Sequence, residues 1–335
     1  MRRITSLSIS STLLWVVSSA IAHHGAAPFD GDRRVTVEGV ITKFEYRNPH
    51  SFIYLRATDS AGDQIDVTIE AAGATGSYYG LTAGSLTPGD AVTAVFNPSW
   101  QRPDEWGLGV EVFKQDGTIV PLSGRYARDL DQSSTGVATS IAGVWLPRSE
   151  DFFSFVTNRR SLPLTEEGSR STQAFDIRDS SQAKCIPYPP PTLMLYSAIN
   201  AIEVLADRVL IHSDWMDGER VIHTGEPDSG TAHLPTLHGY SVGHWEERTL
   251  VVETTDFSEN NSGIASGVPS GSRKYMIERF TLADDGTEIA YSFVLEDPDT
   301  LTESISGGSR WEYRPDLEPG DVACDLESAG RYLTE

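Results

Sequence analysis

Long hydrophobic runs are absent from this sequence. The most apolar block, Thr12-Leu13-Leu14-Trp15-Val16-Val17, is far shorter than the roughly 20 residues that a membrane helix needs. The block follows Arg2 and Arg3 and precedes Ala20-Ile21-Ala22, an order that is typical of a secretory signal peptide. We therefore expect residues 1–22 to be a Sec-type signal peptide cleaved after Ala22, which would leave a periplasmic or secreted protein without a membrane span.

Basic residues are scarce as well. The chain has 26 Lys and Arg against 48 Asp and Glu, which gives a formal net charge of −22. A chain with this charge repels phosphate backbones and anionic lipids, so nucleic acids and membrane surfaces are unfavourable partners. The acidic side chains themselves indicate a well-solvated surface.

Only two cysteines occur, Cys185 and Cys324. An even pair in an exported protein predicts a disulfide, which would tie the start of the second half of the chain to its C-terminal region. In the chain-entropy model such a long closed loop contributes about 3–5 kcal/mol to stability. A catalytic cysteine is the alternative, and it has little support because no histidine is near Cys185 in the sequence.

Several catalytic motifs are also missing. Ser272 and Ser309 lack the Gly-x-Ser-x-Gly setting of a nucleophilic serine, and no glycine loop for phosphate is present. No two histidines have the close His-x-x-x-His spacing of a zinc site. None of these features indicates an oligomeric state.

What the sequence does contain is a succession of short β-strand patterns. In the first half, apolar and polar residues alternate at 35–44, 51–55, 64–70, 91–96, 107–113 and 118–120, with turn residues between these segments. Strands of this length and spacing predict a small OB-like barrel over residues 23–122. Residues 123–140 are polar and show little apolar periodicity, so we expect them to be a linker.

The second half, residues 141–335, is also mostly β. Strand patterns lie at 209–212, 220–223, 240–245, 249–255, 275–282, 288–295 and 301–306, and no long amphipathic helix is evident. Sequential antiparallel strands in this number must close into a lipocalin-like barrel or pair into a sandwich to hide their edges. The predicted fold is therefore all-β, with a small barrel followed by a larger barrel or sandwich.

Two stretches resemble families of uncharacterised exported bacterial proteins. The first runs from Ala22-His23-His24-Gly25 through the strand at 35–41 to Asn48-Pro49-His50, and it resembles a small secreted β-domain of unknown function over roughly residues 22–122. The second comprises Ser241-Val242-Gly243-His244-Trp245-Glu246 and Thr249-Leu250-Val251-Val252-Glu253-Thr254, with Arg279-Phe280-Thr281 further on. Both resemblances imply export and a β-domain, and neither implies a reaction.

A first candidate site consists of His23, His24 and His50. After cleavage His23 would be the N-terminus, where the α-amine and imidazole can hold a metal while a second histidine completes the set. Imidazole nitrogens suit copper and zinc, and copper lies high in the affinity series. The alternative is a solvated chain start that binds nothing.

A second candidate site lies in the larger domain. If Glu247-Arg248 forms a two-residue turn, His244 shares a face of the hairpin with Glu253. Arg279 and Tyr275 share a face of the following strand, and we expect both to project into the same cavity as His244. Polar groups on an apolar barrel lining are typical of a ligand pocket or an acid–base site. The alternative is a buried structural ion pair or a core histidine whose hydrogen bonds are satisfied. Five histidines gather in this domain, at positions 212, 223, 233, 238 and 244.

These observations favour an exported protein that binds an apolar or aromatic small molecule in the barrel of its second domain. The alternative is a cofactor-independent lyase, isomerase or hydrolase, in which His244 is the acid or base, Glu253 orients it and Arg279 holds an anionic group. A structural or assembly role is the third interpretation. Convergence of the polar side chains on one dry cavity would favour chemistry over a structural role.

Overall fold

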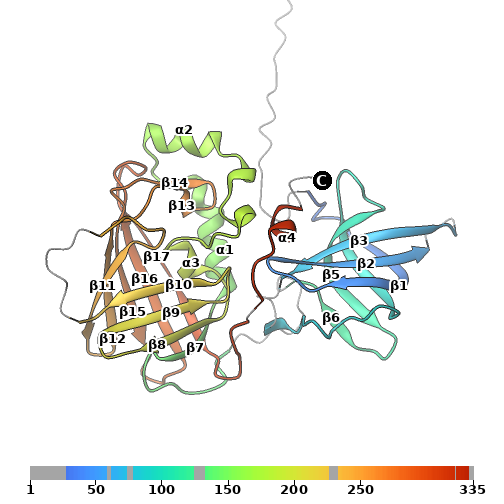
Figure 1. Ribbon diagram of the computed structural model, residues 1–335, viewed down its shortest axis with the longest axis horizontal. Coiled ribbons are helices and arrows are strands. Elements are labelled where there is room, and N and C mark those ends of the chain that lie inside the picture. Colours follow the sequence, from blue (N-terminus) through green and yellow to red (C-terminus); the bar gives the residue numbers. More distant parts are fainter. Residues whose placement is uncertain are drawn as a thin grey trace, which may run out of the picture.

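The strands of this protein form two separate barrels, one from each half of the chain (Figure 1). The computed structural model describes residues 28–58, 62–73, 78–123, 133–225, 233–320 and 322–331. The expected signal peptide, His23 and His24 lie outside these residues. Among the described residues, no helix has the length and apolar character needed to cross a membrane. The all-β fold class predicted from the sequence is confirmed.

The first barrel closes from five strands. The strand order β3-β2-β1-β4-β5 is joined into a ring by a parallel pairing between β3 and the start of β5, and β6 pairs with the later part of β5. This is the small OB-like barrel that the alternation predicts. Side chains on the inner face, such as Ile53, Ile69 and Val112, are fully buried. The strands are β1 (Val35–Glu45), β2 (His50–Thr58), β3 (Gln64–Ala72), β4 (Ala91–Pro98), β5 (Trp106–Lys114) and β6 (Ile119–Pro121).

The second barrel closes from nine strands, so the barrel rather than the sandwich is confirmed. Neighbouring strands are antiparallel except at one seam, where β10 and β11 are parallel and share only two residue pairs, Ile222 with Ser241 and His223 with Val242. In barrel order the strands are β10 (Gly218–His223), β11 (Tyr240–Glu246), β12 (Thr249–Thr255), β15 (Tyr275–Leu282), β16 (Glu288–Glu296), β17 (Ile305–Tyr313), β7 (Gly143–Pro147), β8 (Asn200–Val204) and β9 (Arg208–Ser213).

One strand prediction is wrong. Residues 301–304 lie outside any strand, and the ninth strand begins only at Ile305. Its first half carries Gly307 and Gly308, which have low strand propensity, yet both are required by close packing. A Cβ on Gly308 would lie 2.4 Å from the carbonyl oxygen of Tyr291, and one on Gly307 would lie 2.8 Å from the ring of Phe293.

Segments that the sequence pattern does not predict fill one end of the large barrel (Figure 1). The buried helix α3 holds them together, because Thr192 Oγ1 donates to Ile264 O at 2.9 Å and Trp311 Nε1 donates to Met194 O at 3.1 Å. The segments are α1 (Ser149–Asn158), η2 (Arg159–Ser161), α2 (Glu166–Ala174), η3 (Ile177–Asp179), η4 (Gln182–Lys184), α3 (Thr192–Leu195), β13 (Asn260–Ala265) and β14 (Val268–Ser270).

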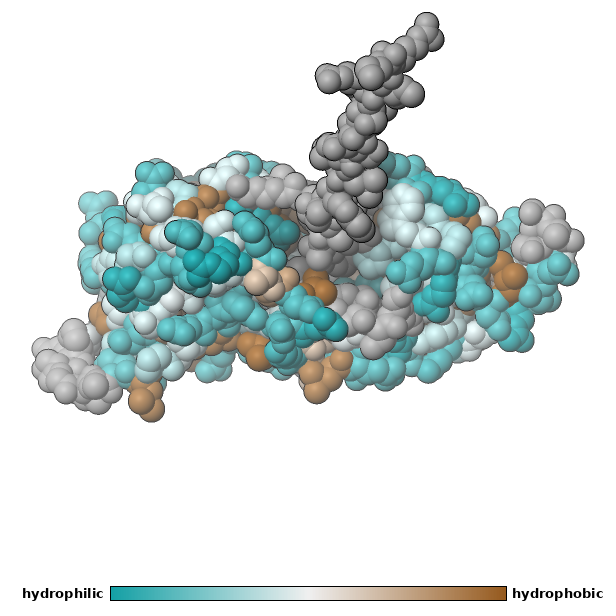
Figure 2. Space-filling view, turned by 90° about the horizontal axis from the view of Figure 1, so that it is seen from above, coloured by the Kyte–Doolittle hydropathy of each residue, from teal (hydrophilic) through white to brown (hydrophobic). Residues whose placement is uncertain are grey.

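The C-terminal segment, residues 322–331, joins the two barrels. The predicted disulfide between Cys185 and Cys324 is present, with Cα atoms 5.7 Å apart. The chain then packs on the first barrel, where α4 (Leu326–Gly330) lies beside β2 (Figure 1). Asp325 N donates to Asn48 O at 2.7 Å, and Arg331 Nη1 donates to the hydroxyl of Tyr54 at 2.6 Å. The face of the molecule in Figure 2 is mostly hydrophilic, which agrees with the acidic composition.

Candidate functional site

The four candidate residues of the second domain lie on the outer face of the barrel, not in its interior. On β12, Leu250, Val252 and Thr254 are buried, whereas Glu253 between them is exposed. His244 and Arg279 are also exposed, and Tyr275 is half-buried. The expectation that these side chains line an internal cavity is therefore wrong, although the prediction that His244 shares a face with Glu253 agrees with the register.

On this outer face the candidates form two separate pairs. Glu246 accepts from Arg279 Nη2, and its other oxygen lies 3.4 Å from His244 Nε2. The hydroxyl of Tyr275 donates to Glu253 Oε2 at 3.0 Å. Arg279 also lines a surface hollow of about 430 Å³ with Ile277, Ser292, Phe293, Val294, Ser306 and Gly307. Solvent surrounds all of these groups, so their ion pairs are weak.

The interior carries a different polar set, built on Arg220 and Glu278, which are 1% and 0% exposed. Arg220 Nη1 donates to Glu278 Oε1 at 2.8 Å, and the hydroxyl of Tyr291 donates to the same oxygen at 2.9 Å. The other terminal nitrogen of Arg220, Nη2, donates to Ser241 Oγ at 3.1 Å and to Thr254 Oγ1 at 3.0 Å. Burial lowers the pKa of Arg220, but the charge and hydrogen bonds of Glu278 raise it more, so the guanidinium stays charged.

The sequence does carry a signal for this buried pair. Glu278 shares the buried face of its strand with Met276 and Phe280. Arg220 likewise shares the buried face of its strand with Gly218 and Ile222, so each charge lies on an inward face. Aromatic side chains fill the rest of the interior. The Phe280 ring centroid lies 5.0 Å from that of Tyr291 and 5.7 Å from that of Trp311. The centre of the barrel is a packed core rather than a ligand cavity.

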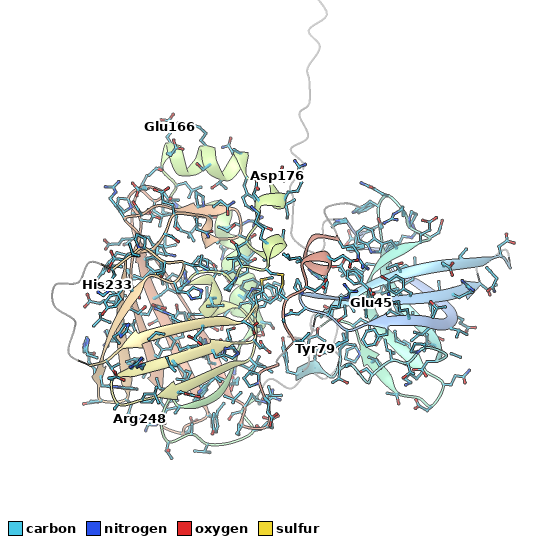
Figure 3. The ribbon with its side chains drawn as sticks, viewed as in Figure 1. Glu45, Tyr79, Glu166, Asp176, His233 and Arg248 are labelled. Carbon is cyan, nitrogen blue, oxygen red and sulfur yellow. A yellow bond between two sulfur atoms is a disulfide. The ribbon has the colours of Figure 1, made fainter. Side chains whose placement is uncertain are left out.

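A cavity of about 290 Å³ opens instead at the seam between β10 and β11. Before the two strands pair at Ile222, β10 and the segment 236–240 diverge, and His238 bridges the gap with Nδ1 2.7 Å from Glu219 O. Figure 3 labels His233, next to this segment, on the side of the large barrel turned away from the small one. The lining residues are Glu219, Arg220, Val221, His223, Thr236, Leu237, His238, Gly239, Tyr240 and Ser241.

His238 is a neutral imidazole at physiological pH. Burial lowers its pKa to about 4, the Arg220 charge acts in the same direction, and the backbone carbonyls of Glu219 and Tyr188 oppose the shift. A carbonyl oxygen only accepts hydrogen bonds, so either of these two carbonyls can accept the single proton of the neutral ring. Nε2 is buried and makes no hydrogen bond with a described residue. The same is true of Arg220 Nε, so two polar atoms beside the cavity lack partners among the described residues.

Aromatic rings stack at the edge of this cavity. The Tyr240 ring stacks with two imidazoles, with centroid distances of 4.9 Å to His223 and 3.5 Å to His233. His223 and Tyr240 both line the cavity, so they offer it a partly apolar wall together with Val221 and Leu237. Of the five clustered histidines, the seam therefore gathers His223, His233 and His238, while His212 and His244 lie elsewhere on the barrel.

Two further buried ionisable groups lie outside the cavity lining. Lys274 is 2% exposed, donates to the carbonyl oxygens of Pro190 and Gly263, and has Nζ 4.3 Å from the centre of the Phe257 ring. Burial lowers its pKa to about 7. Asp214, 4% exposed, accepts from Ile199 N at 3.0 Å, and burial raises its pKa to about 7.

Of the three candidate metal ligands, His23, His24 and His50, only His50 lies within the described residues. His50 Nδ1 lies 3.0 Å from Glu70 Oε1, and the backbone of His50 exchanges hydrogen bonds with Ser328. A carboxylate beside Nδ1 is common for histidines that bind a metal through the other nitrogen. Within the described ranges, no group of three His, Cys, Asp or Glu side chains is placed to hold a metal ion. His23 and His24 lie outside those ranges.

Comparison with known proteins covers only the N-terminal part of the chain. Residues 12–107 match the model of a family of unknown function, DUF6152, which agrees with the resemblance of this region to an uncharacterised small domain. The resemblance of the second domain stays a prediction. No curated protein matches the sequence. The comparisons thus relate the small barrel to a family without an assigned activity.

Proposed function

We propose that this protein is an exported binding protein for a small aromatic molecule, and that the seam cavity between β10 and β11 is its site. The observation that carries the proposal is a cavity of about 290 Å³ with aromatic, apolar and polar lining. Pockets of this composition are typical of ligand sites, and roughly 300 Å³ is the lower end of their size range. A molecule with a single ring system fits this volume.

The packed interior supports the choice of this site. Trp145, Trp311 and Phe280 are fully buried in the barrel core, and the helical insertion closes one end. A ligand in the centre would have to displace these rings, whereas a ligand at the seam would separate only strands that share two residue pairs. The cost of opening is therefore lowest where the cavity already lies.

Export is supported by the signal-like pattern of residues 1–22 and by the Cys185–Cys324 disulfide, since such bonds persist in oxidising compartments. Intact-mass analysis of protein purified from the periplasm tests this part. A chain that starts at His23 supports cleavage after Ala22, and a retained leader in the cytoplasmic fraction contradicts it.

Metal binding at His23, His24 and His50 is a secondary part of the proposal. It rests on the sequence pattern and on the carboxylate of Glu70 beside His50 Nδ1. Titration of the mature protein with Cu²⁺ and with Zn²⁺ tests it. One equivalent bound by the wild type and lost in His50→Ala would support the site, and unchanged uptake in that variant would contradict a role for His50.

Catalysis by His244, Glu253, Arg279 and Tyr275 has weaker support than binding. These groups are paired with one another and stand in solvent, where hydrogen bonds and charges stabilise a transition state far less than in a water-excluded site. A cofactor-independent enzyme is therefore the second candidate, with the hollow beside Arg279 as a cavity on that face.

Binding is tested by isothermal titration calorimetry with single-ring compounds such as phenol, indole and toluene. The variant His223→Ala removes a ring that lines the cavity and stacks on Tyr240. His212→Ala on β9 is the matched control, since this half-buried histidine is not part of the lining. We expect saturable binding that His223→Ala weakens and His212→Ala leaves unchanged. Equal effects of the two variants, or no saturable binding, would overturn the proposal.

A further inference from the structure

We propose that the contact between the two barrels loosens when Asp214 loses its proton, so that the barrels are held together more firmly below neutral pH than above it. The observation that carries this proposal is the position of Asp214. Its carboxylate is buried where tyrosines of the small barrel meet the large barrel, and Oδ2 has no hydrogen-bond partner among the described residues.

The small barrel brings tyrosines to this contact. Tyr46, Tyr78 and Tyr79 pack on the core of the small barrel. Figure 3 labels Tyr79 on the side of the small barrel that is turned toward the large one. The hydroxyl of Tyr78 lies 3.2 Å from Ser197 Oγ, in the loop between α3 and β8 of the large barrel. A tyrosine of one barrel therefore contacts the loop of the other.

The same loop of the large barrel holds Asp214. Ile199 N, two residues after Ser197, donates to Asp214 Oδ1 at 3.0 Å. Asp214 directly follows β9, and the next residue, Trp215, has its ring centroid 4.1 Å from that of Tyr196. The contact with the small barrel and the hydrogen bond of Asp214 thus lie within three residues of each other, beside packed aromatic rings.

The charge of Asp214 acts on both sides of the contact. Burial raises the pKa of Tyr46 and of Tyr78, and the Asp214 carboxylate raises both further. On the large barrel, burial and the same carboxylate raise the pKa of Tyr196. Coulomb interactions are strong only at short range and away from water, so Asp214 lies near hydroxyl groups of both barrels.

The groups that face Asp214 determine what its ionisation does. Burial is the largest effect and raises its pKa from 3.8 to about 7. The N–H groups of Gly320 and Ile199 lower the pKa, and the carboxylate of Asp217 raises it. The three tyrosines are neutral at ordinary pH, and none of these groups is a cation. An ionised Asp214 is therefore a buried charge without a positive partner among the groups that face it, which is costly.

Opening of the contact removes this cost because water then reaches the carboxylate. In the open form the pKa of Asp214 returns toward 3.8, whereas in the closed form it is about 7. Between pH 4 and 7 the open form releases the proton and the closed form retains it, so the closed form becomes less favourable as pH rises through this window. From pH 5 to pH 8 the ratio of open to closed molecules should rise by up to about 100-fold.

Hydrogen exchange of the full chain at pH 5 and pH 8, measured for each amide by NMR, tests this proposal. After correction for the intrinsic exchange rate, the amides of Ile199 and Asp214 should lose protection by up to about 100-fold, while amides within β2 and β12 should change far less. Asp214→Asn should abolish this loss because its side chain never ionises. Asp214→Ser is a second neutral variant, for which we expect the same result.

Asp217→Asn is the matched control. It removes an exposed carboxylate from the neighbouring turn and keeps Asp214, so the loss of protection between pH 5 and pH 8 should persist. Equal protection of Ile199 and Asp214 at both pH values would overturn the proposal, and so would a loss that persists in both neutral variants. A loss of the same size within β2 and β12 would also overturn it, because the whole chain would then be unfolding.

Discussion

Replacement of Asp214 by Asn is expected to stabilise the folded protein at neutral and alkaline pH. The carboxylate of Asp214 is buried, Oδ1 accepts from Ile199 N at 3.0 Å, and Oδ2 has no hydrogen-bond partner among the described residues. Burial raises its pKa from 3.8 to about 7, against the smaller opposing effect of the backbone N–H groups of Gly320 and Ile199. An asparagine keeps the acceptor for Ile199 and never carries the charge.

The sign of the pH effect follows from the raised pKa. Between pH 4 and 7 the unfolded chain releases the proton of Asp214 while the folded chain retains it, so the stability of the wild type falls as pH rises through this window. At 1.36 kcal/mol for each pKa unit, a rise from 3.8 to about 7 corresponds to about 4 kcal/mol as an upper limit. Above pH 7 the loss is complete.

Urea unfolding at pH 5 and pH 8, followed by tryptophan fluorescence, measures this difference. We expect Asp214→Asn to exceed the wild type in unfolding free energy by about 2–4 kcal/mol at pH 8, and by less at pH 5. Asp284→Asn is the control, because it removes the same charge from a fully exposed turn. If the Asp214→Asn and wild-type stabilities change in parallel with pH, Asp214 does not titrate differently in the folded and unfolded states, and the reasoning is refuted.

Three further outcomes are expected. Glu278→Gln leaves the buried Arg220 charge without its partner and should lower the unfolding free energy by about 3–5 kcal/mol; a loss below about 1 kcal/mol would contradict a buried ion pair. Thiol labelling of the unreduced, denatured protein should find no free thiol, and Cys185→Ser should lower stability by about 3–5 kcal/mol because Cys324 lies 139 residues away; two labelled thiols would contradict the bond. His244→Ala should change stability by less than about 0.5 kcal/mol and leave ligand binding intact, and loss of binding would place the site on the outer face.

Strand positions were predictable where one face of a strand is clearly apolar. The first barrel follows this rule, and each of its six strands overlaps a segment of alternating residues. Elements that depend on tertiary contacts were not predictable. Helix α3 is buried on every side, so Thr192–Leu195 shows no amphipathic period. The start of β17 was not predictable because Gly307 and Gly308 have low strand propensity. Close packing against neighbouring residues requires glycine at both positions.

The position of the site could be predicted only in part. Val251 and Val252 are both buried, although they face opposite sides of β12. The sequence pattern of this hairpin therefore does not indicate which face points into the barrel. On β15, Met276 and Phe280 identify the inward face of the strand. Glu278 shares that face, so this interpretation requires that a charged side chain be placed in the core. The seam cavity depends on how far β10 and the segment 236–240 diverge, and no local pattern encodes that distance.

The central claim, a ligand site at the β10–β11 seam, is tested most directly by the histidines themselves. Titration with phenol, followed by ¹H–¹³C NMR of the imidazole groups, reports on both faces of the barrel in one experiment. Saturable shifts of His223 and His238, with His212 and His244 unchanged, are the predicted result. Shifts confined to His244, or no saturable shift at His223 and His238, would contradict the claim.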